Sequence, residues 1–95
     1  MKVTLEFIGF PDVVQAAGQK KVSLDIQGET VKDVISSLVE QYGEKVKGSF
    51  YNDDGSFDPN VQIILNEENY VSLDQHDTQV REGDHVTFML VMAGG

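Results

Sequence analysis

TVKDVISSLVEQYG, residues 30–43, decides the fold of this chain, because it predicts one long amphipathic helix. Thr30 is a suitable N-cap, and Asp33 three residues later completes a variant of the capping box. Gly43 is well placed to end the helix. The apolar residues recur at spacings of three and four and so share one face: Val31, Val34, Ile35, Leu38 and Tyr42. The stretch therefore predicts a helix from Thr30 to Tyr42.

Apolar and polar residues alternate on both sides of this helix, which is typical of half-buried strands. The predicted strands are, in chain order, residues 3–7, 22–26, 61–65, 70–73 and 85–92. The first two form an antiparallel hairpin, and we expect its connection, from Gly9 to Lys20, to be a turn and a loop. Residues 48–60 are polar, acidic and rich in turn formers, and they predict a second long loop with Phe50 as a core anchor.

The order strand, strand, helix, strand, short strand, strand is that of the ubiquitin-like β-grasp, an α+β fold. We expect a mixed sheet of about five strands packed on one main helix. The last strand should be central and parallel to the first, and the second face of the sheet should be free of helices. The predicted core comprises Val3, Leu5, Phe7, Val22, Leu24, Ile26, Val34, Ile35, Leu38, Ile63, Leu65, Val86, Phe88 and Leu90.

The charge balance is acidic, with 16 Asp and Glu residues against 7 Lys and Arg and a net charge of −9. Binding to a phosphate backbone or an anionic membrane requires clustered basic residues, so we expect neither nucleic acid nor a membrane as partner. The excess acid serves either solubility alone or docking onto a basic protein surface. The absence of cysteine excludes disulfides and zinc–thiolate sites. With no long apolar run and no secretory leader, residues 1–95 are expected to form a single cytoplasmic domain.

The sequence finishes in Gly94-Gly95, directly after the apolar last strand and Ala93. Glycine has no side chain and lets a partner's backbone come close. We therefore expect a flexible tail that enters a narrow cleft and presents the α-carboxylate of Gly95 to chemistry on another protein. The alternative is the ordinary fraying of a chain terminus.

Three features together resemble the MoaD/ThiS family of sulfur carriers, and the resemblance covers essentially the whole chain. They are the strand and turn of residues 61–67 (VQIILNE), the Arg81-Glu82-Gly83-Asp84 turn before an apolar strand, and the final Gly94-Gly95. The family includes the small subunit of molybdopterin synthase and the carrier of the thiamin pathway.

The resemblance implies a carrier protein rather than an enzyme. A ubiquitin-activating-type enzyme would adenylate the Gly95 carboxylate, and sulfur would then replace AMP to give a thiocarboxylate. A sulfur-accepting synthase subunit would be the second partner. No cofactor is expected to bind this chain, because the ATP is used by the activating enzyme. Molybdopterin or its tungsten counterpart is favoured over thiamin as the product served.

Two other functions remain open from the sequence. In the first, the protein is a ubiquitin-like modifier whose Gly95 is joined to lysines of target proteins. In the second, it is a β-grasp interaction module whose Gly94-Gly95 carries no chemistry.

Strand alternation also predicts a docking surface. If the even-numbered residues of the last strand face the helix, Met89 and Val91 face the opposite way. By the same alternation, Ile64 and Ile8 point outward from the third and first strands. We expect Ile8, Ile64, Met89 and Val91 to form one apolar patch beside the tail, as partner sites often do. The alternative is that the last strand is covered on both faces.

Other candidate sites fail on their spacing. Aligning Gly55 with the glycine of a calcium loop puts Phe50 and Val61 at its first and last ligand positions. Residues 43–49 have the outer spacing of a phosphate loop but lack the lysine that directly precedes the serine in that motif. His76 and His85 have no ligand spacing, so we expect no metal site and interpret both as solvated or capping residues.

Overall fold

The computed structural model describes residues 1–72 and 77–91 and has eight helices and strands in this part of the chain. In chain order they are β1 (Lys2–Ile8), α1 (Pro11–Ala17), β2 (Lys21–Asp25), α2 (Val31–Tyr42), α3 (Glu44–Lys47), β3 (Val61–Leu65), β4 (Asn69–Ser72) and β5 (His85–Leu90). None of the helices within the described residues has the length and apolar character required to cross a membrane.

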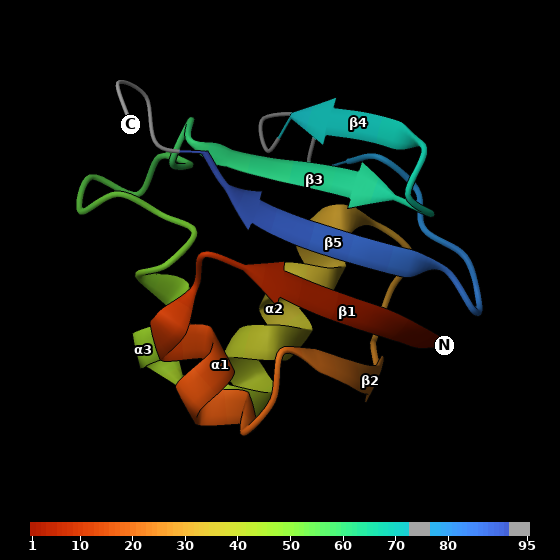
Figure 1. Ribbon diagram of the computed structural model, residues 1–95, viewed down its shortest axis with the longest axis horizontal. Coiled ribbons are helices and arrows are strands. Elements are labelled where there is room, and N and C mark those ends of the chain that lie inside the picture. The colour runs from red at the N-terminus through yellow and green to blue at the C-terminus, as the bar shows by residue number, and fades with distance from the viewer. Residues whose placement is uncertain (73–76, 92–95) are drawn as a thin grey trace.

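The strands form one mixed sheet of five in the order β2-β1-β5-β3-β4, which confirms the predicted fold. β1 and β5 run parallel at its centre, and the other neighbours are antiparallel. Thr4 pairs with His85 and Phe7 with Phe88, so the two ends of the sequence meet in the middle of the sheet. Figure 1 shows that α2 crosses one face of the sheet and leaves the strands of the other face uncovered by helices.

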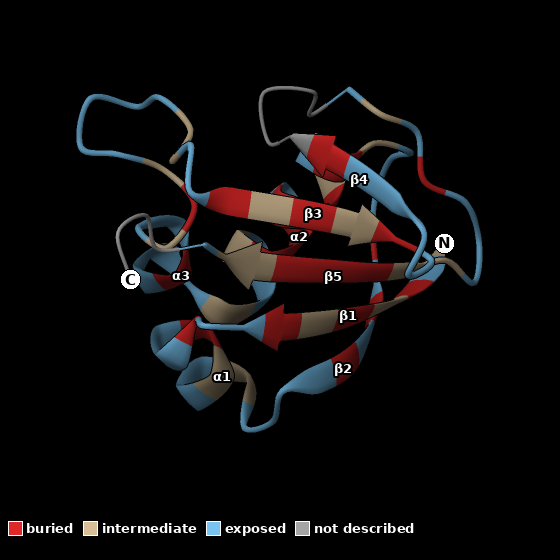
Figure 2. Ribbon diagram, turned by 45° about the horizontal axis from the view of Figure 1, so that its top comes forward, coloured by how far each residue is buried: buried red, intermediate tan, exposed pale blue. Residues whose placement is uncertain are grey.

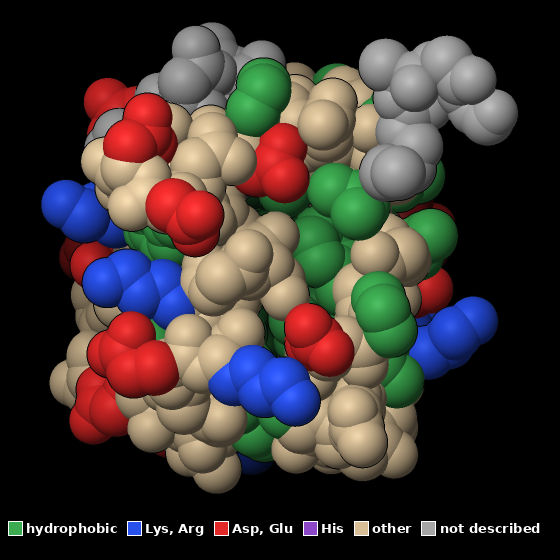
Figure 3. Space-filling view, turned by 90° about the vertical axis from the view of Figure 1, so that its left-hand side faces the viewer, with side chains coloured by type: hydrophobic (Ala, Val, Ile, Leu, Met, Phe, Trp, Pro, Cys, Tyr) green, Lys and Arg blue, Asp and Glu red, His purple; other side chains and the backbone are tan. Residues whose placement is uncertain are grey.

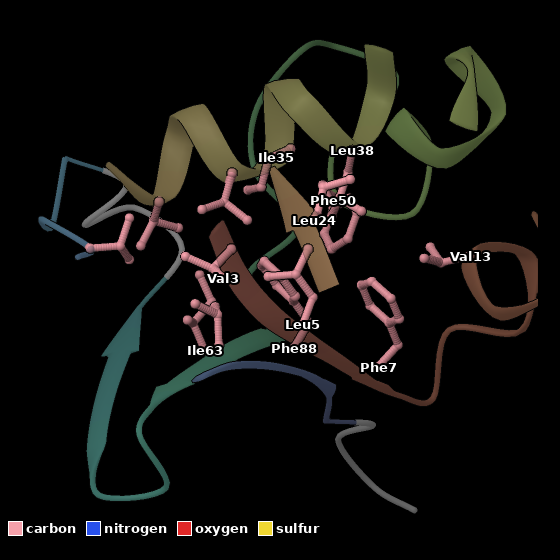
Figure 4. Packing of buried hydrophobic residues seen from close by; sticks show 14 of the residues in the cluster. Val3, Leu5, Phe7, Val13, Leu24, Ile35, Leu38, Phe50, Ile63 and Phe88 are labelled. Carbon is pink, nitrogen blue, oxygen red and sulfur yellow. The ribbon is translucent and has the colours of Figure 1, made fainter. Parts of the chain in front are cut away.

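The core lies between this face of the sheet and the helices. Thirteen of the fourteen predicted core residues are buried, and Leu90, at the end of β5, is only partly buried. Phe50 is fully buried as well, in the place expected of a core anchor. Its ring meets Phe88 edge-on at 5.1 Å, and Phe88 in turn stacks on Phe7 at 6.0 Å. Figure 4 shows these rings between β1, β5 and α2, and Figure 2 shows how buried residues alternate with more exposed ones along β1 and β3.

Helix α2 begins and ends as the sequence predicts. Thr30 Oγ1 accepts a hydrogen bond from the Asp33 amide at 3.3 Å, and Asp33 Oδ2 accepts one from the Thr30 amide at 3.0 Å. The two bonds make a complete capping box. Gly43 ends the helix with φ +100, a conformation that residues with a side chain rarely adopt.

The lack of a side chain at Gly28 leaves space for the Asp33 side chain in this cap. Asp33 Oδ2 also accepts a bond from the Glu29 amide at 2.9 Å, which brings its carboxylate against the Gly28 backbone. A Cβ atom at Gly28 would lie 2.3 Å from Asp33 Cγ, and its φ of +103 already favours glycine. The Glu29 and Thr30 hydrogen bonds hold the pKa of the Asp33 carboxyl below its usual range.

The predicted loop between β1 and β2 is wrong, because it contains the helix α1. Pro11 occupies the first turn, where its missing N–H costs no hydrogen bond. Gly18 ends the helix in the left-handed conformation, and its amide donates to the Val14 carbonyl at 2.8 Å. Val13 is fully buried, so packing against the core, rather than a side-chain cap, stabilises this short helix.

Candidate functional site

The face of the sheet that carries no helix displays cross-strand rows of side chains from β1, β5, β3 and β4. One row contains Ile8, Met89 and Gln62, because Met89 pairs with Ile8 on one side and with Gln62 on the other. The next contains Glu6, Thr87, Ile64 and Tyr70. We call this the outer face.

The outer face is apolar at the end where β5 finishes. Ile8 and Val91 are each 44% exposed there, and Met89 between them is half-buried. The parity predicted for β5 is therefore confirmed, since Phe88 is buried and Met89 points the other way. Figure 3 views this end of the molecule and shows hydrophobic side chains gathered among acidic groups and lysines.

Ile64 does point outward, but it does not lie directly beside Met89. Its cross-strand neighbour is Thr87, and Gln62 occupies the position opposite Met89. Thr87 is buried although it faces outward, because its small side chain lies between the longer Glu6 and Ile64 in the central row. The predicted patch is thus continuous over Ile8 and Met89, and Ile64 joins it diagonally.

Tyr70 also belongs to this surface, although it is not among the residues predicted for the patch. It lies opposite Ile64 on the edge strand β4 and is 66% exposed, the highest value among the exposed large hydrophobic residues. Its neighbour Val71 is buried, so the alternation within β4 carried the signal. Exposed tyrosines often act as anchors in protein interfaces, because one end of the ring is apolar and the other is polar.

The opposite end of the outer face is charged. His85 Nε2 lies 3.1 Å from Glu6 Oε1, and His85 Nδ1 lies 4.0 Å from Glu67 Oε1. Lys21 Nζ approaches the same Glu6 oxygen at 3.9 Å. The His85 side chain is 21% exposed, so it is only partly solvated, and it lies between the Glu6 and Glu67 carboxylates. His76 lies outside the described residues.

The β3–β4 turn fixes the start of β5. Asn66 and Glu67 have φ values of +54 and +64, as a tight hairpin turn requires. Asn66 Oδ1 accepts a hydrogen bond from the His85 amide at 2.9 Å, and Asn66 Nδ2 donates to Asp84 Oδ1 at 3.2 Å. These contacts set the register in which β5 crosses the sheet.

The far end of β5 is held from two sides before the tail begins. The Val91 amide donates to the Asn60 carbonyl at 2.7 Å. On the other side, Gly9 has a φ of +85, and a Cβ there would lie 3.2 Å from Leu90 Cβ. The predicted tail residues Ala93, Gly94 and Gly95 lie outside the described residues, as does Met92. Residues 1–72 and 77–91 contain no cluster of three or more His, Asp or Glu side chains that could hold a metal ion.

Known proteins are similar to this chain in sequence and in fold. Residues 10–95 match the ThiS family model. The sulfur carrier protein ThiS of Thermus thermophilus is 31% identical over 70 residues, covering 74% of this chain and 84% of its own. Small archaeal modifier protein 3 of Haloferax volcanii is 31% identical over 96 residues, covering 100% of both chains. The crystal structure of SAMP1 from Haloferax volcanii superposes with a TM-score of 0.76 at 20% identity, covering 100% of both chains, and supports the fold.

The family match spans nearly the whole domain, including β5 and the final glycines, and the β-grasp sheet agrees with it. The chain therefore belongs to the ThiS family of ubiquitin-like sulfur carrier and small modifier proteins.

Proposed function

We propose that this protein is a sulfur carrier whose Gly95 carboxylate is activated by an ATP-dependent partner. The observation that carries the proposal is the position of β5, which is central in the sheet and leads directly into Gly94-Gly95. A central strand of this kind fixes the place on the domain from which the chain continues toward Gly94-Gly95. The family membership supports the same reading.

The chemistry takes place on the tail and needs no acid or base from the folded domain. A carboxylate oxygen of Gly95 attacks the α-phosphorus of ATP, forming an acyl-adenylate and releasing pyrophosphate. A sulfur nucleophile supplied by the partner system then attacks the acyl carbon, and AMP leaves with the bonding electron pair. The product is a thiocarboxylate, which delivers sulfur to an acceptor bound to a synthase subunit. Molybdopterin-type synthesis is the first acceptor pathway to test.

The outer face is the proposed docking surface for both partners. Its apolar end, formed by Ile8, Met89 and Val91, lies beside the point where the tail leaves the sheet. Glu6 lies in the central row and Glu67 lies beside His85 at the other end, and the chain as a whole carries a net charge of −9. A partner surface with an apolar centre and a basic rim is complementary to this arrangement.

The direct test is intact-mass spectrometry of the protein purified from its native cell. Replacement of one carboxylate oxygen by sulfur adds about 16 Da at the C-terminus. A variant that lacks Gly95 serves as the control, because it should keep the melting temperature of the wild type but lose both the added mass and ATP–pyrophosphate exchange. Exchange activity at the wild-type level in this variant would refute the proposal.

A second candidate function, protein modification, is favoured by the full-length match to small archaeal modifier protein 3. Here a lysine amine of a target protein, instead of a sulfur nucleophile, displaces AMP and forms an isopeptide bond with Gly95. Proteomic digestion would then detect lysines that carry the C-terminal residues of this chain. Adducts without any thiocarboxylate would favour the modifier, and thiocarboxylate without adducts would favour the carrier.

A further inference from the structure

Residues 48–60, the acidic loop to which the sequence assigns no role, form an ordered hairpin. Tyr51 and Phe57 pair across it, with ring centroids 4.8 Å apart. At its tip the Asn52 amide donates to the Ser56 carbonyl at 2.7 Å, and Asp54 Oδ1 accepts bonds from the Ser56 hydroxyl at 2.6 Å and amide at 3.0 Å. A segment with this many internal hydrogen bonds has a defined shape and is not a flexible loop.

The base of the hairpin is anchored beside the strand that carries the tail. Phe50 is fully buried, and its ring contacts both Phe88 of β5 at 5.1 Å and Phe10 at 5.2 Å. The Asp58 amide donates to the Phe50 carbonyl at 3.0 Å and closes the hairpin above this anchor. The position of Asp58 is therefore fixed relative to β5 through the core.

Asp58 in turn fixes the residue that holds the end of β5. Its Oδ1 accepts a hydrogen bond from the Asn60 amide at 2.9 Å, which makes a tight turn of the type that aspartate favours. The Val61 amide donates to the Asp58 carbonyl at 3.2 Å. The Asn60 peptide is thus held at both ends, and its carbonyl accepts the Val91 amide at 2.7 Å. Val91 is the last residue that the structure describes before the tail.

We propose that hairpin 48–60 positions the C-terminal tail, with Asp58 as the positioning residue that acts through Asn60 on Val91. This inference rests on the proposed function, because it assumes that the tail reacts in a partner's active site. Asp58 fixes the position of Val91, the residue from which the tail continues, and the close packing of Gly9 on Leu90 limits displacement of this end of β5 to the other side. A misplacement of about 1 Å in a reacting group can lower a rate by up to a hundredfold.

The test compares three single variants in ATP–pyrophosphate exchange with the adenylating enzyme encoded by the same genome. Asp58→Ala removes the acceptor for the Asn60 amide. Asp58→Asn removes the same charge but keeps a side-chain oxygen as acceptor. Asp53→Ala, at the exposed tip of the hairpin, removes one charge without touching the Asn60 bond. The full-length protein and the Gly95 deletion are measured in parallel.

We expect Asp58→Ala to lower kcat about tenfold at an unchanged half-saturating concentration, because the outer face still docks. Asp58→Asn should recover most of the rate, and Asp53→Ala should match the wild type. Equal rates for Asp58→Ala and the wild type, with the Gly95 deletion inactive, would overturn this inference alone. An active Gly95 deletion would instead overturn the proposed function.

A second measurement keeps the inference testable if Asp58→Ala does not fold. Amide hydrogen exchange of the wild type should show the Val91 amide protected to a similar degree as the amides of β5, since it is bonded to Asn60. Where Asp58→Ala folds, that protection should fall while the Phe88 amide remains protected; the wild-type arm stands by itself. A Val91 amide that exchanges in the wild type as fast as an unstructured one would overturn the proposal.

Discussion

Replacing Gly28 with alanine should destabilise the domain through the helix cap rather than through the core. The new Cβ would lie 2.3 Å from Asp33 Cγ and 2.8 Å from Asp33 Cβ, so the Asp33 side chain must move. Its bonds to the Glu29 and Thr30 amides would then be lost. Loss of a capping interaction costs about 1 kcal/mol, and an unpaired neighbouring amide about 1 kcal/mol more. The positive φ of an alanine adds roughly 1–2 kcal/mol.

These contributions add to about 3–4 kcal/mol in the free energy of unfolding, which corresponds to a melting temperature roughly 12–32 °C lower for a domain of this size. Urea denaturation followed by circular dichroism measures the change directly, with a midpoint lower by roughly 2–3 M if the slope is about 1.5 kcal/mol/M. The wild type and the variant should show equal slopes, because the unfolded surface is the same.

Gly43→Ala is the matched control, because Gly43 has nearly the same φ, +100 against +103, and a Cβ added there would meet no neighbouring atom within 4 Å. It should cost only the conformational part, about 1–2 kcal/mol. In an Asp33→Ala background, Gly28→Ala should cost less than in the wild type, since the clashing carboxylate is gone and only the contact with the Cβ of residue 33, at 2.8 Å, remains. Equal losses for Gly28→Ala and Gly43→Ala in the wild-type background would refute the reasoning.

Three further predictions concern the docking face, the cap and α1. Met89→Asp should weaken binding to the activating enzyme more than tenfold in calorimetric titration, because it places an unpaired charge in the interface. The melting temperature should change little. Unchanged affinity would show that Met89 is not part of the docking surface. Asp33→Asn should cost about 1 kcal/mol at neutral pH. Since its folded pKa is depressed, this difference is present above about pH 4 and disappears as the pH falls through the folded pKa, which urea melts at several pH values will detect. Val13→Ala should cost about 2 kcal/mol in the same melts; a loss below about 0.5 kcal/mol, the size of a surface substitution, would show that α1 packs loosely.

Local signals predicted α2 and the faces of the strands correctly. The Thr30–Asp33 cap and the helical spacing are contained within a few residues, and burial alternates along β1 and β3 as the sequence does. The helix α1 was missed although Pro11 and Gly18 bracket it. It has seven residues and no side-chain cap, so its stability comes from Val13 in the core, which a local reading does not see.

The sequence predicts which strand residues point outward at the candidate site, but not which of them lie opposite one another. Alternation alone placed Met89 and Ile64 outward, yet only the pairing of β3 with β5 shows that Thr87 lies opposite Ile64. The position of Tyr70 opposite Ile64 likewise follows only from the pairing of β3 with β4. The bond from Val91 to Asn60 joins residues far apart in sequence, and no composition or spacing signals it.

The central position of β5 also determines when the domain can be completed during synthesis. Without β5 the sheet separates into two hairpins, β1–β2 and β3–β4, because neither pairs with the other directly. Isolated hairpins of this kind are marginally stable in water. The nascent chain therefore cannot close its core until residue 90 has emerged from the ribosome. Chains interrupted before that point leave the apolar faces of both hairpins exposed and are prone to aggregation and proteolysis.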